Sequence, residues 1–136
     1  MTDITVTNRG SVFAPSRAWL AEKHGTDLPK HVTYDFTTFT HANFTTNKMI
    51  PSGTILGVIT ATGKYGPYDS SATDGRQTAA RFEMNWVPIP EDKTKVITGA
   101  ALEHCGVRVP ALPLKTGPGS LDAKARTDLK HVVFYG

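Results

Sequence analysis

The chain has 136 residues, 39% of them hydrophobic and 20% charged, which suits one domain that buries a core without metal or disulfide support. Its 15 basic residues are interspersed with 12 acidic ones and leave a net charge of +3, so no basic cluster favours a nucleic-acid partner. The single cysteine excludes an intrachain disulfide. No apolar run approaches the ~18 residues that span a bilayer, and we expect a soluble protein made in a cytoplasm, with no membrane partner.

Residues 1–14 predict an extended arm, because Ile4 and Val6 alternate with polar side chains before a break at Asn8-Arg9-Gly10. No second strand follows at once to form a hairpin. The arm is therefore either an edge strand of its own domain or a strand that joins another protein's sheet. Residues 15–136 are expected to form a single β-rich domain.

The first half of that domain predicts one helix and two strands. Pro15 and Gly25 suit the start and the end of a short helix over 15–24, with Trp19 as its buried anchor. Alternation predicts a half-buried strand over 31–39, with Val32, Tyr34 and Phe36 on one face. A polar loop over 41–48, a turn at 51–53 and a strand over 54–62 follow.

The second half reads as short strands separated by turns. Gly66, Pro67 and Asp69 predict a turn cluster, and Asp74-Gly75 is a pair typical of hairpins that fold one strand back on the next. The further predicted elements are strands over 77–87, 95–102, 104–109 and 131–135, a loop over 110–119, and a helix over 121–129 capped by Ser120. Together they indicate a mainly β fold with two short helices.

Reactive chemistry is not indicated. The five histidines are far apart in the sequence and lack the spacing of a zinc site, so no metal or cofactor is expected. Cys105 is interpreted as a small core side chain and not as the nucleophile of a Cys/His catalytic pair. Its neighbour His104 should point to the opposite face of the strand, where it cannot meet the thiol. Asp69, Asp74 and Glu83 could be imagined as a carboxylate cluster, but their surroundings favour turns. Arg76 and Gln77 are expected to brace the hairpin turn.

Tyr65 and Tyr68 flank Gly66-Pro67 and could present two aromatic faces on one loop. Such a loop would suit a contact between subunits, since tyrosine buries much area at low entropic cost. The tyrosines could equally cover the core of their own domain. The predicted contact residues are Tyr65, Pro67, Tyr68 and Arg76.

Residues 49–80, MIPSGTILGVITATGKYGPYDSSATDGRQTAA, resemble the head decoration protein D family of tailed bacteriophages over more than thirty consecutive positions. Weaker similarity extends through 99–104 and 121–123. Arg81 departs from the small residue common in relatives, and 115–120 matches loosely.

The resemblance implies a compact β-clip type domain that forms trimers and has no catalytic activity. It implies a place on the outer surface of the expanded phage head, at three-fold and quasi-three-fold positions, where the protein clamps neighbouring major capsid protein subunits. The arm would order on the capsid and extend its β structure. The residues implied for the arm are Thr2, Asp3, Ile4, Thr5, Val6, Thr7, Asn8, Arg9, Gly10, Ser11, Val12 and Phe13.

Two other functions remain as alternatives. One is a carbohydrate- or receptor-binding β module of a virion, which would need an exposed aromatic platform. The other is a small trimeric β-clip enzyme, which would need an acidic, Ser/Gly-rich phosphate site that this sequence does not show.

Overall fold

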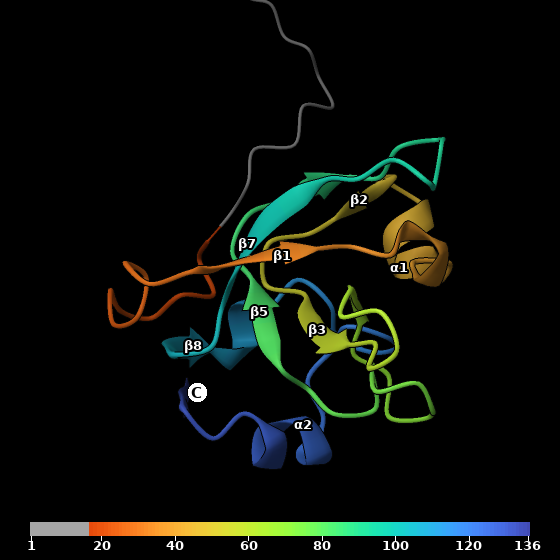
Figure 1. Ribbon diagram of the computed structural model, residues 1–136. Coiled ribbons are helices and arrows are strands. Elements are labelled where there is room, and N and C mark those ends of the chain that lie inside the picture. The colour runs from red at the N-terminus through yellow and green to blue at the C-terminus, as the bar shows by residue number, and fades with distance from the viewer. Residues whose placement is uncertain (1–16) are drawn as a thin grey trace, which may run out of the picture.

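The computed structural model describes residues 17–136, so the predicted arm lies outside the described residues. The described chain is mainly β, with short strands in the middle and the two short helices at the edges of the domain (Figure 1). No helix in this part of the chain is long and apolar enough to cross a bilayer. The strands are β1 (Lys30–Thr33), β2 (Met49–Ile50), β3 (Ile55–Val58), β4 (Tyr65–Pro67), β5 (Arg81–Glu83), β6 (Val87–Pro88), β7 (Thr98–Leu102), β8 (Cys105–Arg108) and β9 (Val132–Tyr135). The helices are α1 (Ala42–Thr45) and α2 (Ala123–Asp128), with single 3-10 turns η1 (Phe36–Thr38) and η2 (Val109–Ala111).

The main sheet has the strand order β1-β7-β5-β3-β4, and all its neighbours are antiparallel (Figure 1). Directly after β1, Tyr34 forms a parallel bridge with Tyr65 of β4. The amide of Asp35 donates to the Tyr65 carbonyl at 2.9 Å. The segment that leaves one edge strand therefore also pairs with the other edge strand. This arrangement covers the otherwise open edge of β4.

Two smaller sheets complete the fold. β2 pairs with β6 in antiparallel fashion, and β8 pairs with β9 in parallel, with Cys105 opposite Val132. Buried side chains form two hydrophobic clusters. One contains Trp19, Phe82 and Leu129, and the other contains Phe36 and Phe44. Burial of this apolar surface is the main favourable term in folding.

The predicted helix over 15–24 is wrong for its described part, because 17–24 contains turns and Leu20 forms an antiparallel bridge with Val107. The expected burial of Trp19 is confirmed, at 1% exposure. The strand predicted over 31–39 ends at Thr33. The chain then turns into η1, and Asp35 caps this 3-10 turn by accepting a hydrogen bond from the Thr37 amide.

The hairpin predicted at Asp74-Gly75 is also wrong. β4 and β5 do not pair with each other, since both pair with β3 between them. The Asp74 carbonyl instead accepts from the Thr60 amide at 3.0 Å. Gly66 and Pro67 form strand β4 and not a turn, which Pro67 tolerates because β4 is an edge strand.

Three further expectations change in detail. The loop over 41–48 contains α1, capped by the His41 side chain. The strand predicted over 77–87 divides into β5 and β6, because the chain leaves the main sheet after Glu83. α2 is capped by Asp122 and not by Ser120, whose hydroxyl donates to the Gly117 carbonyl. The other predicted strands are present but shorter, as β3, β7, β8 and β9.

Candidate functional site

The predicted contact residues around β4 lie close together, but the two tyrosines face different clusters. Tyr65 belongs to the cluster of Phe36, and Tyr68 belongs to the cluster of Trp19. Their exposures are 6% and 2%, and Pro67 is buried as well. The tyrosines therefore do not present two aromatic faces on a loop, and in this chain they cover its own core. A single chain does not test the subunit contact, which stays a prediction.

Both tyrosine hydroxyls have partners. The Tyr65 hydroxyl accepts from Arg81 Nε at 3.2 Å, and the Tyr68 hydroxyl donates to Asp122 Oδ1 at 2.8 Å. Burial and the neighbouring Asp122 carboxylate raise the pKa of Tyr68 above its ordinary value. These hydroxyls tie β4 and the residue after it to β5 and to the start of α2.

Arg76 and Gln77 brace the turn, as the sequence predicts. Arg76 Nε lies 3.1 Å from the Asp74 carboxylate, and Gln77 Oε1 accepts from the Gly75 amide at 2.7 Å. The Arg76 side chain also covers β4, because a Cβ placed on Gly66 would lie 2.6 Å from Arg76 Cδ. Arg76 thus lies beside the tyrosine segment and is more accessible than the tyrosines.

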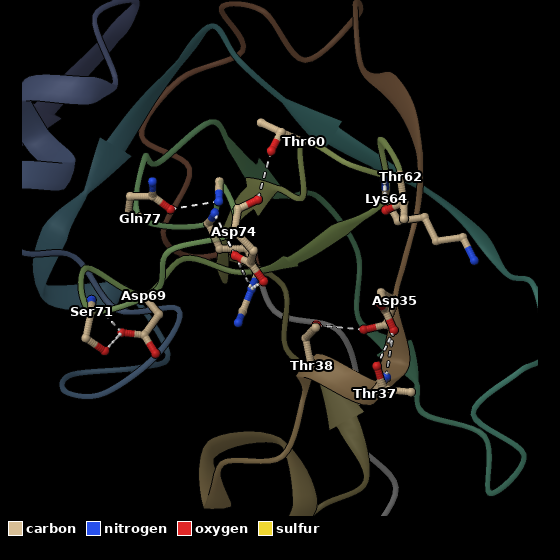
Figure 2. A network of polar contacts seen from close by, with 12 residues as sticks. Asp35, Thr37, Thr38, Thr60, Thr62, Lys64, Asp69, Ser71, Asp74 and Gln77 are labelled. Atoms are coloured by element: carbon tan, nitrogen blue, oxygen red, sulfur yellow. Dashed lines mark hydrogen bonds and ion pairs between the residues drawn. The ribbon is translucent and has the colours of Figure 1, made fainter.

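Short turns built on an aspartate recur through the fold. The carboxylate of Asp35 accepts from Thr37 and that of Asp69 from Ser71, each from the backbone amide and from the hydroxyl two residues on (Figure 2). Asp92 and Thr94 repeat the pattern. The bonds from Ser71 lower the pKa of Asp69. These carboxylates stabilise turns, and no group of potential metal ligands occurs among residues 17–136.

Cys105 has no exposed surface, and burial raises the pKa of its thiol to about 12. A protonated, inaccessible thiol is a poor nucleophile, which confirms the interpretation as a core side chain. His104, by contrast, is exposed on the other face.

Glu83 is a buried charged group of strand β5, so the turn suggested for it together with Asp69 and Asp74 is wrong. Its residue is 0% exposed. Its carboxylate accepts hydrogen bonds from the Tyr34 hydroxyl and from the Asn85 amide. Burial raises its pKa to about 7, although these bonds oppose the rise. The alternating pattern of the strand did not indicate that Glu83 is buried, because its hydrogen-bond partner Tyr34 is 49 residues away in the sequence.

The fold also gathers three histidines that are distant in sequence. The rings of His104 and His131 stack with centroids 4.5 Å apart, and His24 meets His104 edge-on at 6.2 Å. All three are exposed. Sequence spacing gave no sign of this cluster, since the residues come from three separate turns.

The described surface offers apolar contact area outside the predicted site. Leu28 is 82% exposed and Val96 is 68% exposed. A hollow of about 340 Å³ lies between α1 and the 89–93 segment. Its lining combines apolar side chains with charged ones: Phe39, Phe44, Ile89, Lys48, Glu91 and Lys93. Nothing in this arrangement resembles a catalytic constellation.

Comparison with known proteins gives one positive result. Residues 22–131 match the family model described as bacteriophage lambda head decoration protein D. No curated protein and no solved structure matches the chain significantly. The family match includes nearly all of the described domain and confirms the resemblance seen at 49–80. The chain therefore belongs to the bacteriophage lambda head decoration protein D family, whose members are structural, non-enzymatic proteins of the phage capsid head.

Proposed function

We propose that this protein binds as a homotrimer to the outside of the expanded capsid, at three-fold and quasi-three-fold positions. There it clamps neighbouring subunits of the phage major capsid protein. The observation that carries this proposal is the family match over residues 22–131. The domain supports it as a scaffold, because its short strands are joined by turns fixed by side-chain hydrogen bonds. Such a module resists deformation without carrying out chemistry.

The N-terminal arm, Thr2 to Phe13, is proposed to make the capsid contact. Its alternating sequence suits a strand that pairs with an edge in another protein. One such strand binds weakly. Three strands on one trimer multiply their affinities when the geometry lets all of them bind at once.

The test compares the full chain with a variant lacking residues 2–13, using expanded capsids that carry no decoration protein. We expect the truncated protein to remain a folded trimer, with a light-scattering mass about three times that of one truncated chain, which is lighter than the 14.7 kDa of the full chain. It should no longer co-sediment with capsids. Full occupancy by the truncated protein would refute the role of the arm.

A matched pair of double substitutions refines this test. If the arm binds as a strand, Ile4 and Val6 lie on one face and Thr5 and Thr7 on the other. Replacing Ile4 and Val6 by threonine should weaken capsid binding much more than replacing Thr5 and Thr7 by alanine. Equal effects would contradict binding as a strand with one buried face.

The subunit contact is proposed to lie at the segment around β4, with Arg76 as its accessible member and Tyr65, Pro67 and Tyr68 behind it. Arg76→Ala should shift the light-scattering mass from trimer towards monomer. Arg126→Ala is the matched control, because Arg126 belongs to α2, where it lies over the Phe134 ring of β9, and its loss should leave the mass unchanged. An unchanged mass in both variants would place the contact elsewhere.

Four of the six tryptophans and tyrosines are buried too deeply to form the exposed platform that the glycan-binding alternative needs. Trp19, Tyr34, Tyr65 and Tyr68 are buried, and the exposed Tyr135 donates its hydroxyl to Glu22. A sugar-binding platform needs adjacent accessible rings. A glycan array without hits, run beside the capsid assay, separates the two functions.

A further inference from the structure

The segment Arg17–Ala21, which we name the arm anchor, is attached to β8 along its backbone. The Ala21 amide donates to the Gly106 carbonyl at 2.9 Å, and the Arg108 amide donates to the Trp19 carbonyl at 2.6 Å. Leu20 and Val107 form the antiparallel bridge between these bonds. The arm anchor therefore lies along one edge of β8, whose other edge pairs with β9.

The Trp19 side chain fixes the arm anchor to the core. Its ring stacks on Phe82 with centroids 5.3 Å apart. Its Nε1 donates to Ser52 Oγ at 3.0 Å, and Ser52 Oγ donates to the Met84 carbonyl at 2.7 Å. Gly53 leaves space for the ring, since a Cβ there would lie 3.0 Å from two of its atoms.

Arg17 makes the last contacts at the boundary of the arm. Its Nε donates to the Met84 carbonyl at 3.2 Å, and its Nη2 donates to Asn85 Oδ1. Both acceptors lie in the short turn after β5. The Asn85 amide in turn donates to the buried Glu83 carboxylate. The side chain of Arg17 is thus held by a turn that is itself tied to the core.

We propose that the arm anchor fixes the point from which the N-terminal arm leaves the domain, with Arg17 as the residue that positions it, and that capsid binding depends on this fixation. The inference rests on the proposed role of the arm. Because the arm anchor is already ordered in the free protein, it adds no entropic cost of ordering when the arm binds. A force on the arm is also transmitted directly through the arm anchor to β8 and the core. The family match begins at residue 22, so the arm anchor precedes the matched region, whereas its acceptors Ser52, Met84 and Asn85 lie within it.

The test uses the full chain with Arg17→Ala and Asn85→Ala. Lys23→Ala is the matched control, because it removes a positive charge from an exposed position just after the arm anchor. We expect the affinity of each arm for the capsid to fall about 3- to 10-fold in the first two variants. A loss of this size is typical when exposed hydrogen bonds of a charged side chain are removed. The double variant should bind no more weakly than Arg17→Ala alone, since Arg17→Ala already removes the hydrogen bond to Asn85 together with the one to the Met84 carbonyl. The melting temperatures of all these variants should match that of the wild type. The capsid binding of Lys23→Ala should also match that of the wild type.

Hydrogen exchange gives a second readout that needs no capsid. The amides of Ala21 and Arg108 should exchange faster in Arg17→Ala than in Lys23→Ala, while core amides such as that of Tyr68 stay protected. If the wild type binds capsids through its arm but Arg17→Ala binds like Lys23→Ala, the anchor proposal is overturned. If the wild type does not bind capsids, the proposed function fails, and unchanged exchange at Ala21 would then overturn the anchor as well.

Discussion

The hydroxyl of Tyr34 donates a hydrogen bond to the buried carboxylate of Glu83. The two residues come from opposite ends of the β1-β7-β5 arrangement, and Gly99 of β7 makes room between them. A Cβ on Gly99 would lie 1.8 Å from the Tyr34 hydroxyl. This polar pair is therefore enclosed by the main sheet, and it links pH to stability.

Glu83 should make the protein less stable as pH rises. Its pKa is raised from 4.5 to about 7 in the folded state, so the folded protein holds a proton that the unfolded chain has lost between these values. Stability from this group is full below pH 4.5 and is lost as pH rises through 7. At about 1.4 kcal/mol per pKa unit, the loss is about 3 kcal/mol. Chemical denaturation at a series of pH values measures it.

Glu83→Gln should flatten this profile, because glutamine resembles the protonated acid and does not titrate. Glu91→Gln is the control, since Glu91 is exposed and its loss should leave the slope between pH 4.5 and 7 intact. Asp69, Asp74 and Asp92 have lowered pKa values. Their contribution is therefore lost only as pH falls below about 3.8, outside the Glu83 window. A wild-type slope that persists in Glu83→Gln would assign the effect to other groups.

Gly99→Ala should destabilise the fold by about 3 kcal/mol, because the new methyl group overlaps the Tyr34 hydroxyl in a packed interior. Combining it with Tyr34→Phe removes the overlapping oxygen and should recover part of the loss. Gly63→Ala is the comparison. No atom lies within 4 Å of a Cβ at Gly63, but its φ is +75°, so only backbone strain of about 1 kcal/mol is expected. Equal losses at both glycines in urea unfolding would show that the Tyr34 overlap is relieved cheaply.

The sequence predicted burial better than pairing. Alternation placed Val32, Tyr34 and Phe36 on one face, and all three are buried. Strand partners were not predictable, because most strands here have two to four residues and their turn signals are local. Asp74-Gly75 favours a tight turn, yet it cannot indicate that β3 lies between the strands before and after it.

The candidate site shows the same division. The aspartate turns follow from local spacing, since the partner hydroxyl is two residues away. The arm anchor does not follow from local spacing. Pro15 and Gly25 suit the two ends of a helix, but the hydrogen bonds that determine the conformation of this segment come from β8, about 90 residues later in the sequence. The histidine cluster and the Tyr34–Glu83 pair are likewise made by long-range pairing.

Cys105 should resist alkylation in the native protein. With its pKa raised to about 12, only about 10⁻⁴ of the thiol is ionised at pH 8, and no surface is exposed for attack. Mass spectrometry should find no adduct with iodoacetamide over the time in which a sample in denaturant reacts fully. Because labelling then requires unfolding, its rate should rise in Gly99→Ala. Rapid labelling of the stable native protein would contradict the burial of this thiol.

Asp122 should contribute more to stability than the other candidate cap of α2. Its Oδ1 accepts from both the Ala125 amide and the Tyr68 hydroxyl, each at 2.8 Å. Asp122→Ala leaves both donors without this partner and should cost about 1–2 kcal/mol in urea unfolding. Ser120→Ala should cost less, because its hydroxyl serves the Gly117 carbonyl and not the helix.

Two further variants separate the roles of the Asp122 carboxylate. Asp122→Asn should be milder than Asp122→Ala, since an asparagine oxygen also caps helices. Tyr68→Phe combined with Asp122→Ala should cost less than the sum of the single losses, because both remove the same hydrogen bond. Strict additivity would mean that the Tyr68–Asp122 bond contributes nothing. The tie between the segment after β4 and the start of α2 would then rest on the packing of Tyr68 alone.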